Sequence, residues 1–201
     1  MSKILVTGFE PWDDWSHNPS GDIALALDGE TIGGCEIVSA ILPVVHGEDI
    51  AIVRQLIETH DPLAVVSLGL HGSASVLHIE RVAVNLKVIE GEDYPVVDGG
   101  PDAYFATLPT RKMVVGIQEA VQIPAKLTYS AGTFLCNHIM YQVLHEISVN
   151  ELDLKAGFIH LPPTPDMVLD TNKASMALAD TQRGVVGALQ AVAKNVNVLP
   201  L

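Results

Sequence analysis

The chain has 201 residues, 24 of them acidic and 11 basic, which gives a formal net charge of −13 at pH 7. Phosphate backbones and anionic membrane surfaces are bound by clusters of Lys and Arg, so this charge excludes nucleic acid and acidic membranes as partners. Hydrophobic residues make up 48% of the chain and charged residues 17%, which excludes disorder, and no apolar run approaches the ~18 residues of a membrane span.

Short β-rich segments alternate with amphipathic helical segments along the chain. Strands are predicted at 3–6, 36–45, 63–70, 78–89, 125–129 and 156–161, and helices at 48–58, 108–120, 133–147 and 174–194. This alternation predicts one α/β domain over residues 1–201, a three-layer α/β/α sandwich with a mostly parallel, twisted mixed sheet. In such sheets, ligands bind beyond the carboxyl ends of the strands.

The two cysteines lie far apart in the sequence and have no CxxC spacing. They are more consistent with reduced thiols than with a disulfide, and Met1-Ser2-Lys3 with the short apolar run behind it lacks a signal-peptide pattern, so a cytoplasmic location is expected. Cys35 follows the Gly33-Gly34 turn and is predicted to be structural. Cys136 is the thiol with a candidate chemical role.

Cys136 lies in the segment SAGTFLCNH, residues 130–138. Residues 130–132 predict a strand-to-helix turn and Thr133 an N-cap, which places Cys136 in the first turn of a helix. Unpaired N–H groups and the helix dipole favour a thiolate there and can hold an oxyanion. The alternative is a buried Cys that acts as a small hydrophobic residue.

His160 stands near the carboxyl end of the predicted strand AGFIHLPP, which Pro162 and Pro163 terminate. A His at a strand end is well placed to act as the general base for a thiol, and the alternative is a structural His in a loop. His138 lies two residues beyond Cys136, so it faces another side of the helix and is a poor partner for the thiol.

Glu80 is a carboxylate in an apolar pattern. Strand alternation puts it on the same face as Val82 and Val84, where an unpaired charge is costly. Pairing with His160 would orient the base and stabilise its charged form. The alternative is an edge salt bridge with Arg81 and a strand that begins only at Val82.

The remaining motifs are weaker. The turns Gly33-Gly34 and Gly99-Gly100-Pro101 lack dinucleotide or P-loop spacing, and the His residues show no metal-ligand spacing, so neither metal nor cofactor is expected. Phe9, Trp12 and Trp15 share one early loop. That loop either covers a pocket or interface or packs on its own domain, and the residues favour neither.

The motifs together resemble those of pyroglutamyl peptidase type I, the pyrrolidone-carboxylate peptidase family of cysteine peptidases. The matching segments are ILVTGFEPW at 4–12, NPS at 18–20, LP at 42–43, SLGL at 67–70, IERVAVNL at 79–86, GPDAYFATLP at 100–109, SAGTFLCNHIMY at 130–141 and AGFIHLPP at 156–163. They extend over nearly the whole chain, and the segment around Cys136 is the most specific of them.

The resemblance implies Cys136 as the nucleophile, His160 as the base and Glu80 as the orienting acid. The implied reaction removes an N-terminal pyroglutamyl residue from a peptide through a thioacyl-enzyme, without metal or cofactor. The family also forms dimers or tetramers, which implies a homo-oligomer.

The resemblance also implies a mostly apolar pocket for the lactam ring. Its residues would be Phe9, Trp12, Asn18, Leu70 and Phe134. Asn18 would form a hydrogen bond with the lactam, while Phe9, Trp12 and Phe134 would sandwich the ring.

The chain departs from the family pattern in two places. After Asn85 the family has a longer polar segment with an Arg, whereas here the segment is shorter and Glu90 takes the matching position, where an anion would disfavour the thiolate. The residues at 71–74 read HGSA, where the family often has a turn with Gly and Arg. These departures keep two alternatives open: hydrolysis of another small lactam or amide, and non-catalytic binding of pyroglutamyl ends.

Overall fold

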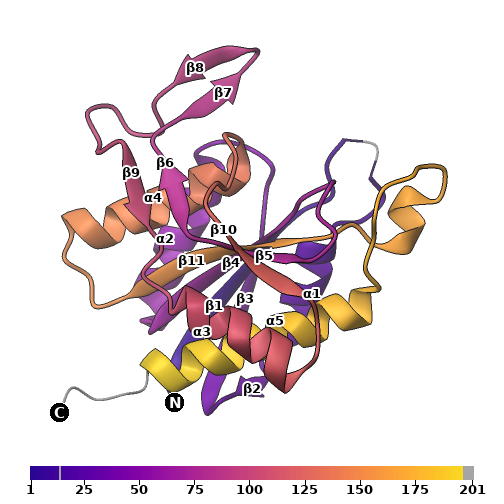
Figure 1. Cartoon of the computed structure of the whole chain (residues 1–201). Coiled ribbons are helices and arrows are strands. Elements are labelled where there is room, and N and C mark those ends of the chain that lie inside the picture. Colours follow the sequence, from indigo (N-terminus) through magenta and orange to yellow (C-terminus); the bar gives the residue numbers. More distant parts are fainter. Residues whose placement is uncertain (14, 197–201) are drawn as a thin grey trace.

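A seven-stranded mixed sheet runs through the centre of the protein (Figure 1). The computed structural model describes residues 1–13 and 15–196, so the predicted domain of 1–201 includes positions outside the described residues. The strand order is β10-β5-β11-β4-β1-β3-β2. Their bounds are Lys3–Phe9 (β1), Thr31–Ile32 (β2), Cys35–Leu42 (β3), Ala64–Leu70 (β4), Leu77–Glu80 (β5), Ala125–Thr128 (β10) and Lys155–Leu161 (β11).

Most neighbouring strands in this sheet are parallel. The exceptions are the antiparallel pairs β11–β5 and β3–β2. Every residue of β4 from Ala64 to Gly69 is buried, as expected for a strand covered on both faces. The sheet is therefore mixed and mostly parallel, as predicted.

Helices cover both faces of the sheet (Figure 1). Helices α2 (Glu48–His60) and α4 (Leu135–Val149) pack on one face, over a core that includes Val65 and Phe158. The other face is covered by α1 (Pro19–Leu27), α3 (Thr110–Val115) and α5 (Leu178–Val196). The prediction of a three-layer α/β/α sandwich is thus confirmed.

Helix α1 was not among the predicted elements, although its start carries a recognisable signal. Asn18 accepts a hydrogen bond from the backbone N–H of Ser20 as N-cap, and Pro19 occupies the first helical position. The apolar residues that follow this cap are too few to show the spacing that predicts a helix.

The predicted strand at 78–89 is wrong as one element. β5 ends at Glu80, whereas β6 (Val82–Val84) pairs with β9 (Ala103–Phe105) in a separate small sheet. β7 (Lys87–Ile89) and β8 (Glu92–Tyr94) form a hairpin that projects from the body (Figure 1). The alternation that put Glu80 on one face with Val82 and Val84 does not survive this break at Arg81.

Three predicted helix boundaries also differ from the structure. The N-cap of α4 is Phe134, not Thr133, and its side chain makes no capping bond. The helix predicted at 108–120 begins only at Thr110, and its second half, Gly116–Ala120, is a π-helical turn. Helix α5 begins at Leu178, because the stretch from 174 to 177 is irregular.

Candidate active site

Strand register brings Glu80 and His160 together. β5 and β11 are antiparallel, with Glu80 opposite Phe158 and His78 opposite His160. Because Phe158 and His160 lie two residues apart, they point to the same face, so Glu80 and His160 are diagonal neighbours on that face. The fold therefore places the carboxylate next to the imidazole, although the predicted alternation was wrong.

Glu80 and His160 form a buried ion pair. His160 Nδ1 lies 2.8 Å from Glu80 Oε1, and the two residues are only 4% and 1% exposed. An ionised carboxylate can only accept, so Nδ1–H donates and Nε2 remains for Cys136. The alternative salt bridge of Glu80 with Arg81 is not formed, because Arg81 donates to the carbonyl of Ala106.

The surroundings of His160 favour its charged form. Burial by itself lowers the pKa of His160, but the charge of Cys136 and a hydrogen bond with it, together with the hydrogen bond and charge of Glu80, raise the pKa to about 9. His160 is thus an imidazolium at neutral pH. That charge lies next to Cys136, with which His160 forms a hydrogen bond.

Cys136 occupies the first turn of α4 and is half-buried. The first N–H groups of a helix have no partner within the helix, and the side chain of the N-cap Phe134 supplies none. On the sheet side, Gly69 leaves room for the thiol: a Cβ at that position would lie 2.9 Å from Cys136 Sγ. The thiol thus lies between the start of α4 and Gly69 of β4, which has no side chain.

His138 has a structural partner. Its Nδ1 lies 2.9 Å from Oδ2 of Asp49, and both residues are buried. Asp49 Oδ1 also accepts from the backbone N–H groups of Gly47 and Ile50. The pair joins α2 to α4. His138 therefore points away from the thiol, as predicted, whereas nothing in the sequence singled out Asp49.

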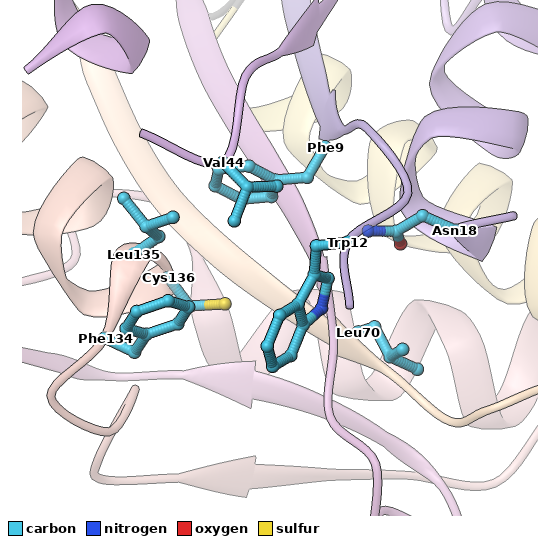
Figure 2. Close-up of a pocket in the computed structure, with 8 residues that line it drawn as sticks. All are labelled: Phe9, Trp12, Asn18, Val44, Leu70, Phe134, Leu135 and Cys136. Carbon is cyan, nitrogen blue, oxygen red and sulfur yellow. The ribbon is translucent and has the colours of Figure 1, made fainter. Parts of the chain in front are cut away.

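A small pocket of about 50 Å³ opens beside the Cys136 sulfur (Figure 2). It brings together the five residues proposed for lactam binding, with two further apolar residues: Phe9, Trp12, Asn18, Leu70, Phe134, Val44 and Leu135. Figure 2 shows the rings of Trp12 and Phe134 on either side of the opening, with the sulfur pointing toward the space between them. Val44 was not singled out from the sequence, although it follows the matching Leu42-Pro43.

The two rings that flank the opening nearly touch. Their centroids are 5.7 Å apart and their planes are tilted by 44°. Trp12 and Phe134 are 41% and 46% exposed, so both side chains have space to move. Trp15 does not line this pocket.

Most of the hydrogen-bonding groups of the Asn18 side chain are used within its own loop. Its Oδ1 accepts from the backbone N–H of Ser20 at 3.1 Å and from its hydroxyl at 2.8 Å, while Nδ2 donates to the carbonyl of Glu10 at 3.1 Å. A side-chain amide carries two N–H donors. One donor of Asn18 therefore remains for a ligand.

His17 ties the aromatic loop to the segment that follows β11. Its Nδ1 lies 2.8 Å from Asp22, and its Nε2 lies 2.9 Å from Asp166 and 3.2 Å from Thr164 Oγ1. Burial lowers the pKa of His17, but the hydrogen bonds and charges of the two carboxylates outweigh this effect and raise it. The loop is thus held by a group whose pKa is raised and whose charge depends on pH.

A larger cavity of about 510 Å³ adjoins the small pocket. The two share Leu70, Phe134 and Cys136, and the larger one is also lined by His71 and His160. Cys136 thus stands at the junction of a small, mostly apolar pocket and a wider one that contains two imidazoles.

The short segment after Asn85 is anchored behind the site. Asn137 exchanges hydrogen bonds with the backbone of Val84 and donates to the carbonyl of Leu86. Glu90 lies at the turn of the β7–β8 hairpin with φ of 52°. The groups that raise the pKa of His160 are Cys136 and Glu80, and Glu90 is not among them.

Among the residues that the structure describes, no group of three or more His, Cys, Asp or Glu side chains is arranged to hold a metal ion. No helix formed by these residues is long and apolar enough to cross a membrane.

Comparisons with known proteins agree on one family. A family model described as pyroglutamyl peptidase matches residues 2–195. Pyrrolidone-carboxylate peptidase from Coprothermobacter proteolyticus is 41% identical over 204 residues, which cover 96% of this chain and 98% of that protein. The corresponding protein from Escherichia fergusonii is 39% identical over 191 residues, covering 91% of this chain and 88% of the relative.

Solved structures give the same result. The crystal structure of pyroglutamyl peptidase I from Bacillus amyloliquefaciens superposes with a TM-score of 0.93 at 31% identity, covering 99% of this chain and all of that one. Pyrrolidone carboxyl peptidase from Thermococcus litoralis superposes with a TM-score of 0.92 at 33% identity, with both chains fully covered.

Proposed function

The chain belongs to the pyroglutamyl peptidase family of cysteine peptidases, which confirms the resemblance, and we propose that Cys136, His160 and Glu80 are the catalytic triad with which it removes N-terminal pyroglutamate. The observation that supports this assignment best is the buried pair of Glu80 and His160 with Cys136 beside it. A carboxylate, an imidazole and a thiol in this order are the groups that covalent acyl transfer requires.

Acylation begins from the thiolate–imidazolium pair. Cys136 Sγ attacks the carbonyl carbon of the pyroglutamyl residue, and the N–H groups at the start of α4 hold the oxyanion. His160 Nε2–H then gives its proton to the leaving amine as the C–N bond breaks. The products of this step are a thioester on Cys136 and a free peptide amine.

Deacylation reverses these roles. The neutral His160 takes a proton from water, whose oxygen attacks the thioester carbonyl. Collapse of the second tetrahedral intermediate expels the Cys136 thiolate and releases pyroglutamate. Glu80 accepts from Nδ1–H throughout and keeps the imidazole in one orientation.

The small pocket suits a neutral lactam better than a charged N-terminus. Among the residues that the structure describes, the pocket is lined by apolar and aromatic side chains with one amide, Asn18, and by no carboxylate that could pair with an α-ammonium. The remaining N–H of Asn18 can donate to the lactam carbonyl. The pocket therefore accepts the blocked residue that ordinary aminopeptidases cannot hold.

Binding of the lactam between Trp12 and Phe134 requires these rings to separate. A flat ring held between two others needs two contacts of about 3.5 Å each, so about 7 Å between the ring centroids. The present 5.7 Å is shorter than that. We propose that Trp12 or Phe134 swings outward as the substrate enters.

The test of this function is hydrolysis of a pyroglutamyl coumarin amide. The native protein should release the fluorophore and lose this activity on alkylation with iodoacetamide. Cys136→Ala should abolish turnover, with Cys35→Ala as the matched control that retains it. Release by the Cys136→Ala variant would refute the assignment of the nucleophile.

A panel of substrates separates the two alternatives. Faster hydrolysis of other N-blocked amides than of pyroglutamyl amides would indicate a changed substrate. Calorimetric binding of a pyroglutamyl peptide without turnover, with Cys136 unreactive to iodoacetamide, would indicate a binding module.

We further propose that the enzyme works in the cytoplasm and as a homo-oligomer, dimer or tetramer. A thiolate nucleophile needs a compartment in which thiols stay reduced, and the cytoplasm is such a compartment. The dimers and tetramers that the family forms support the proposal of an oligomer. Light scattering of the purified protein measures it directly.

A further inference from the structure

The larger cavity lies on the side of Cys136 that the leaving peptide must occupy. With the lactam in the small pocket, the scissile bond lies at the sulfur, where the two cavities meet. Residues after the pyroglutamyl residue then extend into the larger cavity. Of the two imidazoles there, His160 has its role as the base, whereas His71 has none.

His71 is held directly beside His160. It is the first residue after β4, and its backbone N–H donates to the carbonyl of Leu161 at 2.9 Å. The rings of His71 and His160 meet edge to face, with centroids 5.1 Å apart at 88°. The buried ring of His78 lies 5.3 Å away from that of His71. The imidazole of His71 is therefore fixed by backbone register and by two neighbouring rings.

The hydrogen bonds of His71 define its tautomer. The backbone N–H of Ser73 donates to His71 Nδ1 at 3.4 Å, and the hydroxyl of Ser73 lies 3.3 Å from the same nitrogen. Because a backbone amide can only donate, Nδ1 carries the lone pair and the proton of the neutral ring is on Nε2. Within residues 1–13 and 15–196, no protein group accepts a hydrogen bond from this Nε2–H.

His71 is neutral at neutral pH. Its burial and then the positive charge of the neighbouring His160 lower the pKa of His71. A neutral imidazole offers one N–H donor to the cavity without placing a second cation beside the catalytic imidazolium.

We infer that His71 determines specificity for the leaving group, because its Nε2–H binds the first peptide carbonyl beyond the scissile bond. This inference rests on the proposed function. A bond to that carbonyl orients the leaving peptide so that its amine nitrogen faces Nε2 of His160. Simple alkyl amides have no such carbonyl, so the enzyme favours peptides over them.

Two substrates isolate this interaction. Pyroglutamyl-alanine amide carries the carbonyl, whereas pyroglutamyl isopropylamide has a methyl group in place of the carboxamide. The ratio of their kcat/KM values is measured in the native protein, His71→Ala and His71→Gln. His60→Ala is the matched control, since it removes an imidazole that contacts Lys3 and lines neither cavity.

The ratio should fall about fivefold in His71→Ala, the loss expected for one neutral hydrogen bond, and recover in His71→Gln, which keeps an N–H donor. The control should leave the ratio unchanged. His71→Phe keeps the volume of the ring without the donor, and it gives the same test if the Ala variant does not fold.

The outcomes for the two proposals are distinct. An unchanged ratio in His71→Ala or His71→Phe, with both substrates still cleaved, overturns the role of His71 and leaves the peptidase function in place. Failure of the native protein to cleave either substrate overturns the peptidase function itself.

Discussion

Replacing Glu80 by Gln removes one charge beside His160 and nearly preserves the shape of the side chain. Against the lowering effect of burial, Cys136 and Glu80 raise the pKa of His160 from 6.5 to about 9. At about 1.4 kcal/mol for each pKa unit, this shift corresponds to about 3 kcal/mol in favour of the imidazolium. Cys136 contributes more to the raised pKa than Glu80 does, so a part on the order of 1 kcal/mol, or about fivefold in the equilibrium, is assigned to Glu80.

The sign of the effect on activity follows from the raised pKa. In the native protein the imidazolium persists until the pH approaches about 9, so the thiolate–imidazolium pair is lost on the alkaline side. In Glu80→Gln the pKa of His160 falls, and the alkaline limb of kcat/KM should move to lower pH by about one unit. The maximal kcat should also fall about tenfold or more, because the ring is no longer oriented by a charged acceptor.

The assay is the pH profile of pyroglutamyl coumarin amide hydrolysis between about pH 5 and pH 10. Glu90→Gln is the matched control, since it removes the same charge from the turn of the β7–β8 hairpin. Its profile should coincide with that of the native protein. A Glu80→Gln variant with the native alkaline limb would refute the electrostatic argument for Glu80, and a shifted limb in Glu90→Gln would show that the hairpin acts on the site.

Three further changes have expected results. Gly69→Ala places a methyl group 2.6 Å from Cζ of the buried Phe158 and 2.9 Å from Cys136 Sγ, so kcat should fall about tenfold or more and the midpoint of urea unfolding should also fall. Asp49→Ala leaves His138 buried without its partner, so urea unfolding should show a loss of about 2–3 kcal/mol. The pKa of His17 is raised in the folded protein, so its contribution to stability is complete below pH 6.5 and is lost as the pH rises through the folded pKa. His17→Gln should remove this pH dependence from the melting temperature.

Each of these three has an opposing outcome. A native kcat in Gly69→Ala would show that the position of the Cys136 thiol does not require the space left by Gly69. An unchanged midpoint in urea for Asp49→Ala, with Glu92→Ala as the surface control, would show that the buried pair is not stabilising. Equal pH dependence of melting in His17→Gln and the native protein would rule out His17 as the group that titrates.

Much of the sheet and the places of Cys136 and His160 could be predicted from local signals, whereas Glu80 was singled out by an alternation that the structure breaks at Arg81. The run at 63–70 is apolar because β4 is covered on both faces. Cys136 lies at the start of a helix, which the preceding turn residues predict. The break at Arg81 could not be predicted, because it depends on the pairing of β6 with β9, which lies about twenty residues further along the chain. The pairing of Asp49 with His138 depends on the packing of α2 against α4, so it leaves no periodic signal.

The departure from the family pattern at residues 71–74 can be interpreted only with the register of the strands in hand. In the sequence, His71 and His78 are two isolated histidines without metal spacing. The antiparallel pairing of β5 with β11 and the hydrogen bond from His71 to Leu161 bring both rings next to the ring of His160. A local pattern could not group three histidines that meet only through strand register.

The position of the nucleophile is fixed by the three consecutive residues Cys136, Asn137 and His138. Successive residues of a helix point about 100° apart, so these side chains leave α4 in three directions. Asn137 is bonded to the backbone of β6 and of Leu86, and His138 is paired with Asp49 on α2. The first turn of α4 is therefore held from two sides while the third side presents the thiol to His160. Buried polar groups are costly when they are unpaired, so these bonds favour a single placement of the helix start and with it a single position for the sulfur.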